Sequence, residues 1–257
     1  PSMITARRSS AARYIAKASP CATESPTTMM RTGAAAAGVV GDADGSGMPP
    51  LHASAASGCK GAHDLAGVVQ GRQAGPVYGR QGTPKTAALE AKVTAMERGV
   101  ATVSFATGMA AIGAIMLTLT RAGDHVVASR YLFGNTASLL QTLEAHGGDV
   151  TFVDATDARA VEAAVTPRTR LVFVETIANP RTQVADLAGI AEVCARHGLV
   201  YVVDNTMTSP WLFRPSTVGA SLVVNALTKY IGGAGDAPGG RGTHPRLPPR
   251  TRGAGGR

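Results

Sequence analysis

Short apolar runs alternate with amphipathic stretches from about residue 84 to residue 226. The runs are rich in Val and end at turn or polar residues, as buried strands do, and the stretches between them carry apolar residues at helical spacing. The pattern predicts strands at residues 101–105, 125–128, 149–153, 170–174, 199–204 and 221–225. It predicts helices near residues 84–98, 108–120, 135–146, 157–164 and 185–197. Strands that alternate with such helices predict an α/β fold with a mainly parallel sheet covered on both faces.

The two ends of the chain lack this pattern. Residues 1–49 are rich in Ala, Ser, Thr and Gly, with several basic residues before the first acid, Glu24. A transit peptide has this composition, but so does a disordered or spuriously translated leader, which we favour. Residues 50–83 read as an N-terminal arm and residues 84–235 as the α/β domain. Residues 236–257 read as a disordered Gly/Pro/Arg tail that can form neither a helix nor a central strand.

Composition narrows the class of protein. With 257 residues, of which 44% are hydrophobic, the chain is long and apolar enough for a buried core. Three scattered cysteines predict no disulfide framework and favour a reducing compartment such as the cytoplasm. We expect no membrane span, because no run of about 18 apolar residues occurs, and no metal site, because the histidines form no cluster.

The net charge of +8 raises the question of nucleic-acid binding. Five of the arginines lie in residues 237–257, which contain no aromatic residue, so the rest of the chain is not strongly basic. Nucleic-acid-binding domains combine a basic patch with interleaved aromatic residues or with a known binding module. The basic tail has no such aromatic residues, and the sequence shows no such module. We therefore expect no nucleic-acid partner.

Three features fall after predicted strands, where parallel sheets bind their ligands. Thr107-Gly108-Met109 opens a helix whose free N–H groups suit a phosphate, although every such turn offers a helix N-terminus. Asp204 ends an apolar strand, where a helix-capping or structural role is an equal alternative. Lys229 follows the next strand, and alone would be read as a surface lysine. Together, a phosphate cradle, an acid and a lysine are the set that pyridoxal phosphate (PLP) requires.

The sequence also resembles the Cys/Met-metabolism PLP enzymes, which include cystathionine γ-synthase and the O-acylhomoserine sulfhydrylases. The resemblance runs from about Pro50 to Gly233 and lies in the joint order and spacing of short motifs. These are Tyr78-Gly79-Arg80, Thr107-Gly108-Met109, Leu132-Phe133-Gly134, Glu175 with Asn179-Pro180, Val203-Asp204-Asn205-Thr206, and Leu227-Thr228-Lys229-Tyr230. It implies the large domain of a fold type I PLP-dependent transferase, incomplete at the C-terminus.

The resemblance implies a role for each motif. Lys229 forms an imine with the cofactor aldehyde and then moves protons, and Asp204 pairs with the pyridine nitrogen. Gly108, Met109 and the hydroxyl of Thr228 bind the cofactor phosphate, and Phe133 stacks on the cofactor ring. Asn179 lies near the phenolic oxygen of the cofactor, and Thr206 lies beside Asp204. Tyr78 and Arg80 reach the phosphate of a neighbouring subunit, which implies a homotetramer built as a dimer of dimers.

The departures from the family pattern affect the reaction. Phe133 stands where many members have a tyrosine, so ring stacking is kept but a phenolic proton relay is not. Ala226 replaces a serine that binds phosphate. We also expect the antiparallel strand of the family sheet, and the C-terminal domain with its substrate-binding arginine, to be missing, because the tail reads like a wrong reading frame or a truncated gene model. A chain of that kind would be a poor enzyme.

The sequence therefore predicts a PLP-dependent enzyme of sulfur amino-acid metabolism that acts on a small amino-acid substrate. The favoured reaction is γ-replacement on an O-acylhomoserine with sulfide or cysteine. A γ- or β-lyase acting on cystathionine or methionine is the alternative within the family. An inactive truncated fragment or an interaction module is the alternative of another class.

Overall fold

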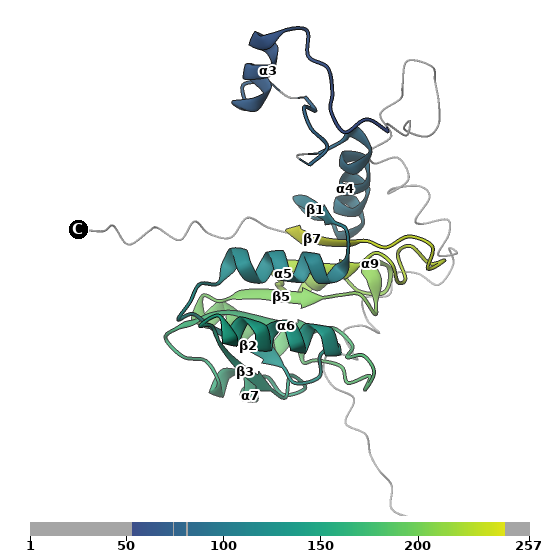
Figure 1. Cartoon of the computed structure of the whole chain (residues 1–257). Helices are drawn as coiled ribbons and strands as arrows, with labels where there is room; N and C mark the ends of the chain where they lie inside the picture. Colours follow the sequence, from purple (N-terminus) through teal and green to yellow (C-terminus); the bar gives the residue numbers. More distant parts are fainter. Residues whose placement is uncertain (1–52, 74, 81, 245–257) are drawn as a thin grey trace, which may run out of the picture.

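A computed structural model describes residues 53–73, 75–80 and 82–244 (Figure 1). The predicted leader, residues 1–49, lies outside the described residues, as does the tail from residue 245 onward. The description therefore covers most of the predicted arm, the whole α/β domain and the first part of the predicted tail.

The described part of the chain forms a seven-stranded sheet in the order β1-β7-β6-β5-β4-β2-β3. Neighbours among β2 to β6 run parallel, whereas β7 runs antiparallel to both β1 and β6. The strands are β1 Ala101–Phe105, β2 His125–Ser129, β3 Asp149–Val153, β4 Thr169–Glu175, β5 Val200–Asp204, β6 Leu222–Ala226 and β7 Gly240–His244. All six predicted strands are present, and the mainly parallel α/β fold is confirmed.

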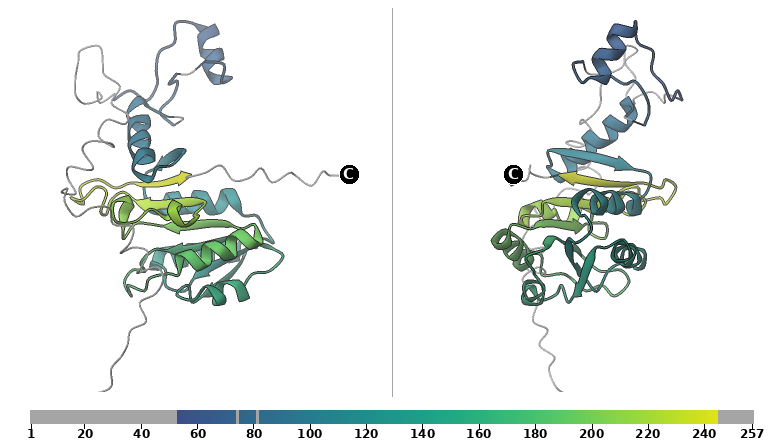
Figure 2. Two further views of the ribbon diagram at one scale, coloured as in Figure 1. Left: turned by 180° about the vertical axis from the view of Figure 1, so that it is seen from behind. Right: turned by 60° about the vertical axis from the view of Figure 1, so that its left-hand side comes forward.

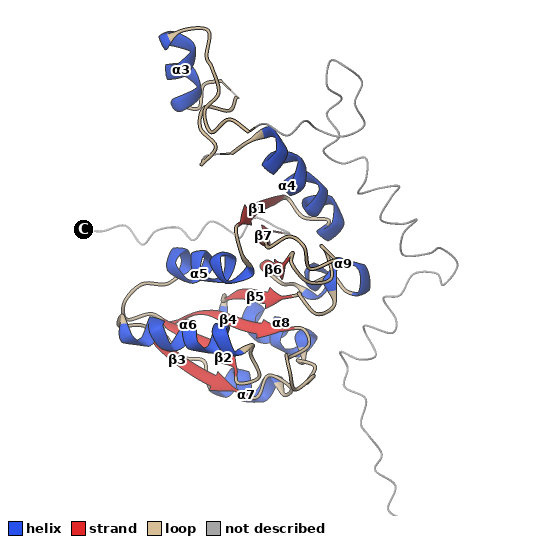
Figure 3. Ribbon diagram, turned by 45° about the vertical axis from the view of Figure 1, so that its right-hand side comes forward, coloured by secondary structure: helices blue, strands red, loops and turns tan. Residues whose placement is uncertain are grey.

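Helices cover both faces of the sheet (Figures 2 and 3). The helices are α3 Ala62–Val69, α4 Pro84–Glu97, α5 Gly108–Leu119, α6 Gly134–Ala145, α7 Ala158–Ala163, α8 Leu187–His197, α9 Ser209–Leu212 and the 3₁₀ turn η2 Pro215–Val218. Alternate residues of each strand point to opposite faces. Leu171 and Phe173 of β4 therefore join the apolar cluster under α5 and α6, while Val172 and Val174 join the cluster under α7 and α8.

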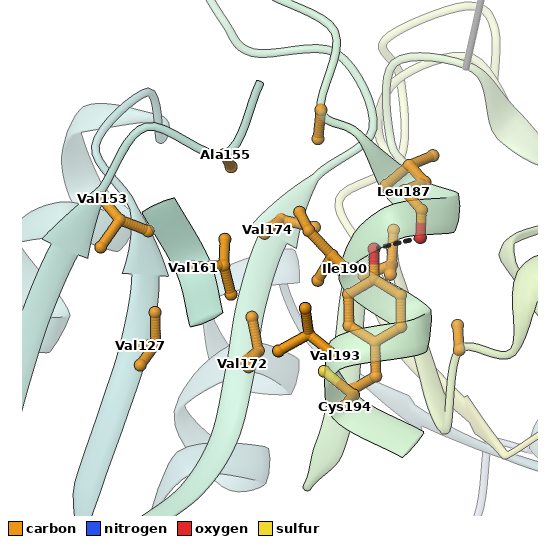
Figure 4. Packing of buried hydrophobic residues seen from close by; sticks show 14 of the residues in the cluster. Val127, Val153, Ala155, Val161, Val172, Val174, Leu187, Ile190, Val193 and Cys194 are labelled. Carbon is orange, nitrogen blue, oxygen red and sulfur yellow. Dashed lines mark hydrogen bonds between the residues drawn. The ribbon is translucent and has the colours of Figure 1, made fainter. Parts of the chain in front are cut away.

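The core beneath α8 shows how the helix pattern fixes this packing. Ile190, Val193 and Cys194 lie on one face of α8 and pack against buried valines of the sheet (Figure 4). Tyr201 of β5 is buried among them, and its hydroxyl donates to the backbone oxygen of Leu187 at 3.3 Å. Burial of apolar side chains at about 25 cal/mol per Å² makes this cluster a main source of the domain's stability.

Strand β7 corrects the prediction for the tail. Residues 236–257 were expected to contain no central strand, and the antiparallel strand of the family sheet was expected to be missing. Instead Gly240–His244 pairs with all five residues of β1 and with four residues of β6. The inner edges of β1 and β6 are therefore covered by β7, and the expectation that this strand is missing was wrong.

Close packing and one buried ion pair explain why this Gly-rich segment forms a central strand of the sheet. Gly240 and Gly242 face α5, and a Cβ on Gly242 would already touch the Ile115 side chain at 3.4 Å. On the other face, Arg241 donates to the Glu97 carboxylate of α4 at 3.1 Å, and both side chains are fully buried. These long-range contacts override the weak strand propensity of the segment.

The N-terminal arm projects away from the sheet, with α3 at its far end (Figures 1 and 3). A single antiparallel bridge between Ala56 and Tyr78 ties its two sides together. Helix α4 then leads into the domain. Thr83 caps this helix by accepting a hydrogen bond from the Thr86 N–H, and Pro84 occupies its first turn as predicted.

Candidate active site

Polar residues gather at the carboxyl ends of the parallel strands β4, β5 and β6. β4 ends at Glu175 and β5 at Asp204, and these two residues are direct partners in the strand register. β6 ends at Ala226, whose N–H donates to the Thr206 hydroxyl at 2.8 Å. The three neighbouring strands thus bring two carboxylates and the loop that follows β6 to one edge of the sheet.

Ala226 is the point where the predicted site residues meet. A Cβ built on Gly108 would lie 2.9 Å from the Ala226 Cβ, so the N-terminus of α5 sits directly against the end of β6. Thr206, which accepts from the Ala226 N–H, also bonds the Asp204 carboxylate. The Lys229 N–H donates to the Ala226 oxygen at 3.2 Å. The structure therefore brings Gly108, Asp204 and Lys229 together around one small residue.

The N-terminus of α5 has the form of an anion site. Thr107 caps the helix by accepting from the Ala110 N–H at 3.0 Å, which leaves the Gly108 and Met109 N–H groups in the first turn without intrahelical acceptors. Gly240 of β7 packs beneath this turn, since a Cβ there would overlap the Thr107 carbonyl. Peptide N–H groups and the helix dipole at this point favour a phosphate.

The Asp204 carboxylate is oriented by Thr206. Its Oδ1 accepts from both the N–H of Thr206, at 2.9 Å, and the Thr206 hydroxyl, at 2.5 Å. Burial raises the pKa of Asp204, and the two hydrogen bonds from Thr206 only partly oppose this effect. Thr206 therefore orients the carboxylate, and its hydroxyl is already used for that purpose.

Glu175 holds two further predicted residues in place. Its Oε1 accepts from the Phe133 N–H at 2.6 Å, and its Oε2 accepts from the Asn179 N–H at 3.2 Å. Phe133 is 43% exposed and Asn179 is exposed, so both side chains are available at the surface of the site. Burial and the nearby Asp204 charge raise the pKa of Glu175 to about 7.

The loop that carries Lys229 is closed by the start of β7. The Thr228 hydroxyl accepts from the Gly239 N–H at 3.0 Å and lies 3.4 Å from the Gly239 oxygen, so it ties the loop to β7. The Lys229 side chain is exposed. Thr228 was expected to supply its hydroxyl to a phosphate, and here that hydroxyl serves the loop.

Tyr78 and Arg80 are not brought to this cluster. Both lie on the arm, which projects away from the sheet in all views (Figures 1 and 2). The Arg80 guanidinium lies 5.0 Å from the centre of the Tyr78 ring, and this ring is 44% exposed. Within one chain these two residues are separate from the predicted cofactor site.

Two features of the site were not assigned from the sequence. Glu175 was noted only as part of a motif, yet it follows a buried apolar strand as Asp204 does, and that signal could have found it. No local pattern in the sequence predicted the close contact of Gly240 with Thr107.

Among residues 53–73, 75–80 and 82–244, no group of three His, Cys, Asp or Glu residues is arranged to hold a metal ion. Within the same residues, no helix is long and apolar enough to cross a bilayer.

Comparison with known proteins agrees with this geometry. Residues 31–243 match the family model of the Cys/Met metabolism PLP-dependent enzymes. The chain belongs to this family. The matched region extends into β7, so the strand that was expected to be missing belongs to the family domain.

Several relatives show how much of the family's length is present. The chain is 39% identical to L-methionine gamma-lyase from Pseudomonas putida over 200 residues, which are 77% of this chain and 50% of that protein. It is 39% identical to cystathionine gamma-synthase from Mycobacterium leprae over 192 residues, 74% of this chain and 48% of that protein. The chain thus spans about half the length of these relatives.

A solved structure supports the fold assignment. An O-acetylhomoserine (thiol)-lyase from Campylobacter jejuni superposes with a TM-score of 0.81 and 27% identity, over 84% of this chain and 54% of that chain. That structure carries a pyridoxyl-lysine phosphate. The fold is accordingly that of the large domain of the fold type I PLP enzymes.

PLP is the cofactor of this family, and the residues present fit it. The N-terminus of α5 offers the Gly108 and Met109 N–H groups, which suit a phosphate group. None of the ion pairs among the described residues involves Asp204, so its carboxylate is available for a protonated ring nitrogen. Lys229 lies on the adjacent loop with an exposed side chain.

Proposed function

We propose that this chain forms the cofactor-binding domain of a PLP-dependent enzyme that acts on sulfur-containing amino acids, with Lys229 as the covalent anchor of the cofactor. One observation carries the proposal: the α5 N-terminus packs against Ala226, the Asp204 carboxylate is joined to Ala226 through the Thr206 hydroxyl, and the Lys229 loop begins there. A phosphate site, an acid and an amine on one rim are the groups that PLP needs.

Each residue has a distinct part in this proposal. The Lys229 Nζ would hold the cofactor, and the same amine would take protons from the substrate and return them. Asp204 would lie beside the ring nitrogen, where an anion favours the protonated form of its partner. Gly108 and Met109 orient the phosphate through their N–H groups. When bound, PLP supplies an electron sink for the electrons left on a substrate carbon that loses a proton.

Phe133 bears on the choice of reaction. A phenylalanine can stack on a ring but has no hydroxyl with which to move a proton. Activation of a bulky amino-acid thiol would therefore lack one base, whereas sulfide is small and largely ionised near neutral pH. We favour γ-replacement on an O-acylhomoserine with sulfide as the nucleophile. γ-Elimination is the second candidate, because relatives of this chain include gamma-lyases of methionine and cystathionine.

The proposed anchor is tested by cofactor binding to the chain itself. Addition of PLP should give a visible absorption band that borohydride reduction converts into a stable adduct, and peptide mass analysis should locate the adduct at Lys229. Lys229→Ala should abolish the adduct. Lys85→Ala, at an exposed lysine in the first turn of α4, is the matched control and should leave it unchanged. An adduct of equal yield in Lys229→Ala would refute the assignment.

The reaction is tested with a protein that joins this domain to the C-terminal half of a relative. O-Acetylhomoserine would be supplied with sulfide or with cysteine, and the products would be separated by mass. Turnover that is faster with sulfide supports the favoured reaction. Faster turnover with cysteine would assign a cystathionine synthase, and release of a 2-oxo acid without either nucleophile would assign a lyase.

The arm belongs to the same proposal. Tyr78 and Arg80 lie far from the site of their own chain, and an exposed guanidinium beside an exposed ring suits a phosphate in a second subunit. We therefore assign these two residues to the cofactor site of a neighbouring copy in a dimer or tetramer. We place the protein in the cytoplasm, where its cysteines would stay reduced.

A further inference from the structure

Glu175 joins two loops that follow different strands. Phe133 lies on the loop after β2, and Asn179 lies on the loop after β4. Each loop gives one backbone N–H to a different oxygen of the Glu175 carboxylate, at 2.6 Å from Phe133 and 3.2 Å from Asn179. One side chain therefore sets the distance between the residue expected against the cofactor ring and the residue expected near its phenolic oxygen.

We propose that Glu175 is a positioning residue that clamps the Phe133 loop and the Asn179 loop together and thereby fixes both residues against the cofactor. The effect of this clamp on cofactor binding rests on the proposed function. The clamp itself is a property of the protein without any ligand.

The surroundings of Glu175 show that its charge is not used to stabilise the fold. The residue is 7% exposed, and none of the ion pairs among the described residues includes it. The charge that acts on it comes from Asp204 of β5, which is also negative. The other polar side chains around the small pocket beside it are uncharged: Ser129, Tyr131, Thr156 and Gln183. A buried carboxylate without a cation is costly and calls for a specific purpose.

Both carboxylate oxygens are needed for the clamp. An ionised carboxylate accepts hydrogen bonds at each oxygen, whereas a glutamine has one acceptor and one donor group. In Glu175→Gln the amide nitrogen would face one of the two backbone N–H groups and could not accept from it. The two backbone hydrogen bonds favour the ionised carboxylate, but burial outweighs them and raises the pKa of Glu175 to about 7. The comparison with glutamine is therefore made at pH 8.5, where Glu175 is ionised.

The clamp is tested first in the full chain without cofactor. Hydrogen exchange at the Phe133 and Asn179 amides would be followed at pH 8.5 in the wild-type protein and in Glu175→Gln. We expect Glu175→Gln to lower the protection of at least one of the two amides roughly tenfold, the equivalent of one charge-assisted hydrogen bond.

A matched control separates the clamp from a general loss of charge. Glu162→Gln makes the same chemical change on α7, where the carboxylate pairs with Arg196 and His197 at the surface. This variant should keep the wild-type protection of the Phe133 and Asn179 amides at pH 8.5. Equal protection in the wild-type protein and in Glu175→Gln at pH 8.5 would overturn the clamp.

The second readout is the affinity for PLP, followed by fluorescence quenching during titration. We expect Glu175→Gln to bind PLP roughly tenfold more weakly at pH 8.5, while Lys229 remains the site of attachment. If PLP fails to bind the wild-type chain, the proposed function fails, but the exchange result still decides the clamp. If PLP binds both proteins equally at Lys229, the positioning role is refuted while the proposed function stands.

Discussion

Carboxylates at the amino edge of the parallel sheet form ion pairs with arginines, whereas the two carboxylates that end β4 and β5 at the carboxyl edge do not. At the amino edge, Asp149 pairs with Arg168 at 2.8 Å and Asp124 pairs with Arg170 at 2.9 Å. The buried His125 has both ring nitrogens within 2.9 Å of threonine hydroxyls. At the carboxyl edge, Glu175 and Asp204 stand side by side, and neither takes part in an ion pair of the described residues.

The pKa directions follow this difference. The hydrogen bond from Arg170 lowers the pKa of Asp124, so the amino edge gains stability from its charges. Burial raises the pKa values of Glu175 and Asp204, so the carboxyl edge loses stability when they ionise. Perturbed carboxylates of the second kind are typical of functional sites, where a ligand supplies the missing charge. The amino edge of this sheet thus gains stability from its ion pairs, whereas β4 and β5 end in carboxylates that a bound cation would stabilise.

The largest expected effect comes from Arg241, whose strand supports the carboxyl edge. Arg241→Met would leave the Glu97 carboxylate buried without its partner and should lower the free energy of unfolding by about 3–5 kcal/mol. Urea denaturation measures the loss. The double variant Arg241→Met with Glu97→Leu removes both charges and should recover most of it. A single variant as stable as wild type would mean that the pair does not hold β7.

The second prediction concerns pH and the carboxyl edge. The pKa of Glu175 is raised in the fold from 4.5 to about 7, so its contribution to stability is fully present below pH 4.5 and is lost as the pH rises through 7. Relative to Glu175→Gln, the wild-type chain without cofactor should lose up to about 3 kcal/mol between pH 5 and pH 8. Urea denaturation of both proteins at each pH measures the difference. A constant difference would show that Glu175 is not perturbed.

The smallest expected effect is at the amino edge and has the opposite sign. Asp124→Asn should destabilise the chain by about 0.5–1 kcal/mol at pH 7, because an ion pair near the surface is worth little more. The pKa of Asp124 is lowered in the fold, so the wild-type advantage should persist down to the usual pKa of 3.8 and vanish below it. Thermal unfolding at pH 7 and pH 3 checks this sign. Stabilisation by Asp124→Asn at pH 7 would remove the contrast between the edges.

Local periodicity was sufficient to predict the strands and helices that bury an apolar face. The run Leu-Val-Tyr-Val-Val before Asp204 identifies β5, and the spacing of Leu187, Ile190 and Cys194 identifies α8. The same reasoning placed Asp204, Gly108 and Lys229 at one rim, because strand ends of a parallel sheet share an edge. These residues are indeed gathered around Ala226.

The sequence by itself therefore determined the parallel sheet, its covering helices and the principal polar residues of the site, because each depends on a pattern within a few neighbouring residues. Only the tertiary structure decided the place of β7. Its segment Gly-Arg-Gly-Thr-His has no apolar alternation. It becomes a central strand because Arg241 pairs with Glu97, 144 residues earlier, and because its glycines allow α5 to pack closely against it. The clamp at Glu175 also joins residues 42 positions apart. Such contacts depend on distance in space, which local propensity does not record.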